Sequence, residues 1–169
     1  RLSAFEIRKN EQGSQIPIWN NGDATVGLPE YQQGEIAVIF ATLFIPPWQY
    51  RGGDWDDQGY KNPSHARKLY HAQIDYYKQL TEENPELFKL IQNQRDLTSV
   101  LNQYEQPLTD KKRQVGLVLL MEGAEGLGDP EELEEYYALG LRLVGPVWAG
   151  NRYCGGSKED RPFDKEGRK

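Results

Sequence analysis

The sequence has a single cysteine, Cys154, among its 169 residues. One cysteine cannot form an internal disulfide, and alone it cannot hold a thiolate metal cluster, which fits a reducing compartment. No run approaches 18 apolar residues, so no membrane-spanning helix is predicted, and residues 1–6 lack the basic and apolar regions of a signal peptide. These absences lead us to expect a cytoplasmic protein.

Positive charge is also scarce. The chain carries 20 Lys and Arg against 26 Asp and Glu, for a net charge of -6, so there is no basic footprint for nucleic acid or for an anionic membrane. The glycine-rich segment 123–128 lacks the spacing of a dinucleotide-binding motif or a P-loop. The chain is also shorter than a complete (β/α)8 barrel of roughly 250 residues.

The first half of the chain predicts one strand followed by several helices. The continuous apolar run 36–45 is typical of a parallel strand buried on both faces, and Pro46-Pro47 ends it. From Pro63 to Leu80, apolar residues recur every three or four positions and predict an amphipathic helix. Asn84-Pro85 then predicts the start of another helix, and residues 97–104 suggest a third.

The second half alternates strand and helix. The apolar run 115–121 predicts a second strand, residues 130–139 a capped helix, and residues 141–148 a third strand. Residues 28–34 form a short helix or turn ahead of them. This alternation favours parallel βαβ units, and therefore an α/β sheet or barrel whose ligand site lies at the carboxyl ends of the strands.

Glu122 directly follows the second predicted strand, so its carboxylate is expected at the mouth of the sheet. A carboxylate there can act as a general base or can bridge two metal ions. From position alone, capping of the adjacent loop or pairing with a nearby arginine is equally plausible. Glu125 lies deeper in the glycine-rich loop, and we assign it to solvent.

The segment after the third predicted strand combines hydrogen-bond donors, aromatic surface and glycines, a composition common in substrate-contacting loops. Its candidate substrate-binding residues are Trp148, Asn151, Arg152 and Tyr153. The alternative is an ordinary polar loop in which Arg152 pairs with an acid and Tyr153 covers an edge of the core.

Other metal-ligating residue types lack a recognisable pattern. His65 and His71 are six residues apart, which places them on different faces of the predicted helix, so both are expected to be structural or exposed. Asp54, Asp56 and Asp57 lack the spacing of a calcium loop and predict a solvated acidic segment.

Several segments, in this order and at compatible distances, resemble the membrane (renal) dipeptidase family, peptidase family M19. They are Gly34-Glu35-Ile36 with the strand running to Phe44-Ile45-Pro46-Pro47, then Leu120-Met121-Glu122-Gly123-Ala124, then Leu139-Gly140-Leu141-Arg142, and finally Gly155-Gly156, Pro162-Phe163 and Lys165-Glu166-Gly167-Arg168.

This resemblance implies a parallel α/β fold of the (β/α)8 TIM-barrel type, present here in part as one domain over residues 1–169 and truncated at both ends. It implies two zinc ions held by an upstream His-x-Asp, a bridging glutamate matched by Glu122, and two later histidines. The implied function is a zinc-dependent dipeptidase with a binuclear site and a metal-activated water. Trp148 stands about where many members carry a histidine.

Two other functions remain open. One is a non-catalytic barrel relative or fragment that binds a small ligand without turnover. The other is a barrel hydrolase or isomerase that uses Glu122 as a metal-free base. The expected partners are a dipeptide or small amide substrate, with a homodimer as one possible assembly, and neither nucleic acid nor a membrane segment.

Overall fold

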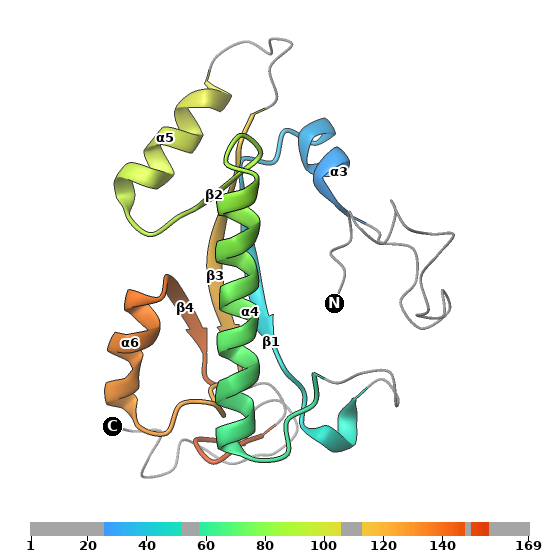
Figure 1. Ribbon diagram of the computed structural model, residues 1–169, viewed down its shortest axis with the longest axis vertical. Helices are drawn as coiled ribbons and strands as arrows, with labels where there is room; N and C mark the ends of the chain where they lie inside the picture. Colours follow the sequence, from blue (N-terminus) through green and yellow to red (C-terminus); the bar gives the residue numbers. More distant parts are fainter. Residues whose placement is uncertain (1–25, 52–57, 106–112, 148–149, 156–169) are drawn as a thin grey trace.

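The computed structural model describes residues 26–51, 58–105, 113–147 and 150–155. These residues form a mixed α/β fold around one parallel sheet (Figure 1). Its central strand is β3 (Val115–Glu122), which corresponds to the second apolar run of the sequence.

Three strands pair with β3, all of them parallel to it. β1 (Val38–Phe44) pairs along one edge from Gly116 to Glu122. β2 (Phe88–Leu90) and β4 (Leu141–Gly145) share the other edge, with β2 beside the start of β3 and β4 beside its end. The carboxyl ends of β1, β3 and β4 therefore meet at one end of the sheet. This confirms the prediction of a parallel α/β sheet.

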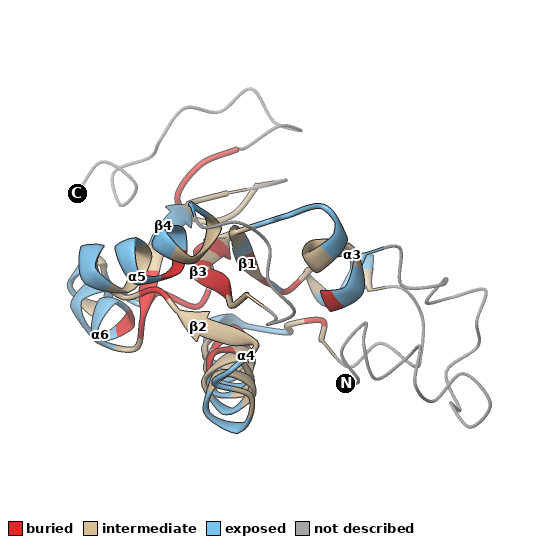
Figure 2. Cartoon of the chain, turned by 90° about the horizontal axis from the view of Figure 1, so that it is seen from above, coloured by how far each residue is buried: buried red, intermediate tan, exposed pale blue. Residues whose placement is uncertain are grey.

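The longest helix, α4 (Pro63–Glu83), runs along one face of the sheet (Figures 1 and 2). Asn62 caps its first turn by accepting a hydrogen bond from the His65 N–H, and Pro63 occupies a position where no N–H is needed. The other helical segments are α3 (Leu28–Gln33), η1 (Trp48–Tyr50), α5 (Gln94–Tyr104), η2 (Pro130–Glu132) and α6 (Leu133–Ala138). No helix among the described residues is long and apolar enough to cross a membrane.

The hydrophobic core lies between α4 and the sheet. Alternate residues of β3 point toward the helix because side chains alternate between the two faces of a strand. Leu117, Leu119 and Met121 are at most 1% exposed, and they pack with Tyr70 and Ile74, which lie one turn apart on α4. The helical periodicity of α4 and the alternation of β3 thus build the same core.

The opposite face of the sheet is not covered by any helix that the structure describes (Figure 2). Phe40 is 63% exposed there, and Phe44 and Leu143 are about 40% exposed. The prediction that the first strand is buried on both faces is therefore wrong for the described residues. An apolar run indicates that a strand is suited to burial on both faces. It does not indicate whether the described residues include the helices that would cover those faces.

The prediction that a helix begins at Asn84-Pro85 is also wrong. The Leu87 and Phe88 N–H groups both donate to the Asn84 carbonyl in a turn, and the chain then enters β2. Pairing with the start of β3 overrides the local helix signal, as the Val115 N–H donates to the Leu87 carbonyl at 2.8 Å. The helix predicted over residues 97–104 is confirmed as α5.

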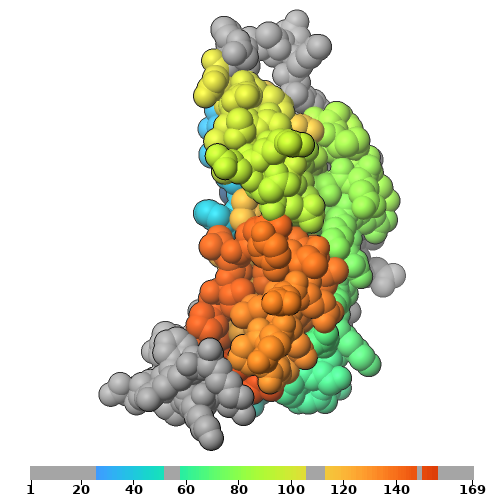
Figure 3. All heavy atoms as spheres, turned by 90° about the vertical axis from the view of Figure 1, so that its left-hand side faces the viewer, coloured from blue at the N-terminus to red at the C-terminus, as the bar shows by residue number. Residues whose placement is uncertain are grey.

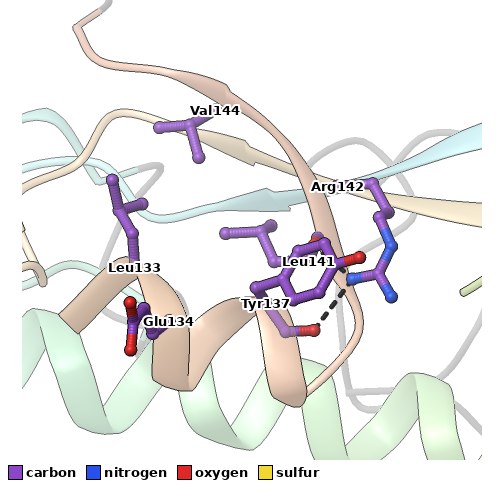
Figure 4. A pocket seen from close by; sticks show the side chains of 6 residues that line it. All are labelled: Leu133, Glu134, Tyr137, Leu141, Arg142 and Val144. Carbon is purple, nitrogen blue, oxygen red and sulfur yellow. Dashed lines mark hydrogen bonds between the residues drawn. The ribbon is translucent and has the colours of Figure 1, made fainter. Parts of the chain in front are cut away.

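A groove follows the outer edge of β4. In the view of Figure 3, α5 lies above the α6–β4 segment on the same side of the molecule. Close up, Leu133, Glu134 and Tyr137 of α6 face Leu141, Arg142 and Val144 of β4 across this groove (Figure 4). Arg142 stacks on Tyr137, with its guanidinium carbon 3.9 Å from the ring centre, and donates to the Tyr137 carbonyl. The groove is thus mainly apolar, with one anionic residue, Glu134, and one cationic residue, Arg142, in its lining.

Candidate metal centre at the carboxyl end of the sheet

Glu122 is the last residue of β3 and lies on the face of the sheet turned away from the buried side chains of that strand. Its register partners are Phe44 on β1 and Gly145 on β4. The pairing of β3 with β4 shifts between Leu119 and Leu120, so that one residue of β4, Arg142, is skipped. Because of this shift, a glycine and not Val144 stands beside Glu122. The flank of the carboxylate is therefore left open.

A small cavity of about 30 Å³ lies at the carboxyl ends of β1, β3 and β4. The polar residues that line it are Glu122, Glu125, Tyr60, Tyr70 and Asn151. A space of this size holds about one small polar occupant such as a water molecule. The residues around it come from stretches that lie far apart in the sequence, as expected for a site at the ends of parallel strands.

The backbone that carries Glu122 is fixed from two sides. The Tyr70 hydroxyl on α4 lies 3.0 Å from the Glu122 carbonyl oxygen and also contacts the Gly123 carbonyl oxygen. On the other side, the Gly123 N–H donates to the Gly145 carbonyl at 2.7 Å. Gly123 has a φ of +79°, a conformation that favours glycine, which lets the chain turn sharply after the carboxylate.

Glu125 was assigned to solvent from the sequence, and that assignment is wrong. The residue is half-buried, and its Oε2 atom is inaccessible to solvent and without a hydrogen-bond partner among the described residues. Burial raises the pKa of this carboxyl, while the charge and the backbone N–H of Arg152 lower it. Burial raises the pKa of Tyr60 to about 12, with a smaller contribution from the charge of Glu125. No spacing in the sequence shows that the loop after β3 folds back toward Arg152.

The predicted substrate-binding loop is only partly brought to the cavity. Asn151 lines it, and its amide donates to the Pro146 carbonyl at 2.7 Å. Arg152 donates to the Glu125 carbonyl at 3.4 Å, and the buried Tyr153 donates from its hydroxyl to the Leu127 carbonyl at 2.5 Å. Both residues therefore join the loop after β4 to the loop after β3. Trp148 lies outside the described residues.

The histidines lie away from this cavity. The Nδ1 atom of His65 accepts from the Lys61 N–H at the start of α4, and His71 packs against Tyr136, with its Nε2 atom 3.6 Å from a carboxylate oxygen of Glu135. The aspartates 54, 56 and 57 lie outside the described residues. Within the described ranges, no three His, Cys, Asp or Glu side chains gather closely enough to hold a metal ion. Glu122 and Glu125 are thus the two carboxylate residues that line the cavity at the strand ends.

Comparison with known proteins identifies a family and structures with the same fold. The sequence model of the membrane dipeptidase family, peptidase family M19, matches residues 5–169. A protein from Acinetobacter calcoaceticus, described as an uncharacterized protein in the PQQ-III 3′ region, is 30% identical over 69% of this chain and 36% of its own length.

Two solved structures share the fold. A metallopeptidase of family M19, dipeptidase AC, has a TM-score of 0.61 at 22% identity over 90% of this chain and 42% of its own. A metallopeptidase from Rhodobacter sphaeroides, bound to a phosphinate mimic of the dipeptide L-Ala-D-Ala, has a TM-score of 0.62 at 19% identity over 90% of this chain and 45% of its own. The chain thus spans less than half the length of these relatives.

Proposed function

The chain belongs to the membrane dipeptidase family, peptidase family M19, and from that premise we propose that it contributes the bridging-glutamate half of a zinc-dependent dipeptidase. In this proposal Glu122 is a ligand shared by two zinc ions. The substrate is a dipeptide or a small amide, hydrolysed at its peptide bond.

The observation that carries the proposal is the placement of Glu122. Its carboxylate stands at the carboxyl end of a central parallel strand, on the sheet face away from α4, with Gly145 leaving its flank free. Active sites of parallel α/β barrels lie at this end of the strands. A carboxylate oxygen is also an ordinary zinc ligand. Glu122 therefore has the chemistry and the position of one ligand of the proposed metal site, and it is the single ligand that the proposal takes from the described residues.

The uncovered face and edge of the sheet support a barrel. Phe40, Phe44 and Leu143 form an apolar surface on the Glu122 face, and β4 has an unpaired outer edge among the described residues, with the groove of Figure 4 beside it. In a (β/α)8 barrel the apolar surface on the Glu122 face would become the packed interior, and the strand of a further βα unit would pair with the outer edge of β4. We propose that residues 1–169 are one part of such a domain.

The chemistry divides between metal and protein. Two bound zinc ions would act as Lewis acids on the peptide carbonyl and would lower the pKa of water at the site. Glu122 would place its carboxylate where both ions can share it. Asn151 would line the approach of the substrate from the loop after β4, whereas Arg152 and Tyr153 bond to the loop after β3 and a role for Trp148 stays a sequence prediction. A cytoplasmic location and a homodimer stay predictions.

The test is Glu122→Gln in the full-length protein. A neutral amide is a poor bridge between two cations, so we expect zinc content to fall and dipeptide hydrolysis to drop by more than about 100-fold, beyond the range seen when only outer-shell partners of a metal are changed. Elemental mass spectrometry gives the zinc content, and L-Ala-D-Ala hydrolysis gives the rate.

Glu134→Gln is the matched control, because Glu134 is an exposed residue of α6 that lines the groove and lies away from the strand ends. It should leave zinc content and rate unchanged. If Glu122→Gln retains both the metal and the rate, the bridging role is wrong. If the wild-type protein binds zinc without cleaving any dipeptide, the non-catalytic alternative replaces the proposal.

A further inference from the structure

Helix α4 reaches the candidate metal centre through two side chains, Tyr70 and Gln73, which lie three residues apart on one face of the helix. Each makes hydrogen bonds to the backbone at the carboxyl end of a strand. Tyr70 reaches the end of β3, and Gln73 reaches the end of β1. The two strand residues that they hold, Glu122 and Phe44, are register partners in the sheet.

Tyr70 makes the more buried of the two connections. Its side chain is 1% exposed, and its hydroxyl contacts the carbonyl oxygens of both Glu122 and Gly123. A phenol has one proton to donate, so the two carbonyls share it. This contact fixes the peptide unit directly after the glutamate. It therefore fixes the direction in which the Glu122 side chain leaves the strand.

The side-chain amide of Gln73 binds both backbone groups of one residue at the end of β1, as the backbone of a neighbouring strand would. Its Oε1 atom accepts from the Phe44 N–H at 2.9 Å, and its Nε2 atom donates to the Phe44 carbonyl at 2.9 Å. The same Nε2 atom lies 3.3 Å from the Gln58 side-chain oxygen. Both backbone groups of Phe44 are thus satisfied, and the end of β1 is held level with the end of β3.

The packing around Tyr70 leaves its ring little freedom. Gly126, in the loop after β3, lies so close that a Cβ atom there would be 2.6 Å from Tyr70 Cδ2 and 2.9 Å from the Arg67 backbone nitrogen. The loop therefore presses directly on α4 where Tyr70 emerges. The ring cannot swing away from the carbonyls without moving the loop.

From these contacts we infer that Tyr70 and Gln73 are positioning residues for Glu122: they act through the backbone of β3 and β1 to hold the carboxylate where it can bind metal. This inference rests on the proposed function and deepens it. Outer-shell partners of a metal ligand set its orientation, and their loss weakens metal binding.

The experiment is a double-mutant cycle on zinc affinity in the full-length protein, with Tyr70→Phe, Glu122→Gln and the combined variant. Zinc dissociation constants are measured by competition with a chelator. We expect Tyr70→Phe alone to raise the dissociation constant about tenfold or more, the range for outer-shell partners. In the Glu122→Gln background the same change should alter it by less than about twofold, because the residue through which Tyr70 acts is already lost.

Tyr136→Phe is the matched control, because Tyr136 is an equally buried tyrosine whose hydroxyl makes no hydrogen bond among the described residues. It should leave zinc affinity unchanged. The same double-mutant cycle is run with Gln73→Met, for which we expect a smaller loss of zinc affinity because the hydrogen bonds of Gln73 are exposed. This second variant also tests the proposal if Tyr70→Phe folds poorly.

The outcomes separate the two claims. The positioning role alone is overturned if Glu122→Gln weakens zinc binding while Tyr70→Phe and Gln73→Met leave the zinc dissociation constant unchanged. An equal loss in both backgrounds also overturns it, because a merely structural effect does not depend on Glu122. If Glu122→Gln itself leaves zinc affinity unchanged, the proposed function fails first.

Discussion

The two faces of the sheet differ sharply although the same strands build both. On the α4 face, Leu43, Leu119 and Met121 are fully buried. On the other face, Phe40 is 63% exposed and Glu122 stands at the strand end. The first face is closed by a helix within the described chain, and its residues stabilise the fold. The second face carries the candidate site and apolar side chains that the described residues leave uncovered.

The difference indicates that the described residues are enough to bury the α4 face, whereas the other face needs further residues to cover it. Packing of α4 on its face of the sheet stabilises the fold by roughly 25 cal/mol for each Å² of apolar surface removed from water. A face with large exposed aromatic residues gains nothing until another element covers it. The proposed barrel removes this asymmetry, because its interior would bury the second face as well.

Phe40→Ala is the change that tests the comparison most strongly. In the full-length protein we expect a loss of about 3–5 kcal/mol in the free energy of unfolding, because the barrel interior would bury the ring. Denaturant titration measures this loss.

Leu119→Ala provides the reference on the closed face, where about 2–5 kcal/mol is expected whether or not a barrel forms. If Phe40→Ala changes the free energy of unfolding by no more than about 0.5 kcal/mol, as for an exposed surface residue, the second face is not a barrel interior.

Gly126→Ala tests how tightly the loop after β3 is tied to the closed face. The added Cβ would lie 2.6 Å from Tyr70 Cδ2 and 2.9 Å from the backbone of Arg67, so α4 or the loop must move. We expect a loss of about 1–3 kcal/mol in the free energy of unfolding, as for overpacking in a core. Thermal or chemical unfolding of the metal-free protein checks it.

Gly128→Ala is a useful control in the same loop, because the nearest atom there is the carboxylate end of Glu132, at 2.8 Å, which a flexible side chain can move. A loss at Gly128 as large as that at Gly126 would show that the loop is sensitive as a whole. Contact with Tyr70 would then not explain the effect.

The sequence predicted most of the sheet but less of the site. The apolar runs located β1 and β3, and the three- and four-residue spacing located α4. β2 was missed because three residues are too few for a periodic signal, and Asn84-Pro85 mimics a helix start. The position of Glu122 at the carboxyl end of β3 was predicted from its place after an apolar run, and its role as a metal ligand stays a prediction. The contacts of Tyr70, Gln73 and the loop at Glu125 join segments distant in sequence, which no local pattern encodes.

The smallest expected effect comes from two tyrosines buried on helices, Tyr70 on α4 and Tyr136 on α6, which share their burial but differ in their hydrogen bonds. The Tyr70 hydroxyl is bonded to backbone carbonyls, whereas the Tyr136 hydroxyl has no partner among the described residues. Leaving a buried polar group unsatisfied costs about 1–3 kcal/mol, so Tyr136→Phe should be neutral or stabilise the protein by up to about 1 kcal/mol. Tyr70→Phe should destabilise it. Equilibrium unfolding of both variants measures the difference, and a Tyr136→Phe loss as large as that of Tyr70→Phe would mean that the Tyr136 hydroxyl is bonded in solution.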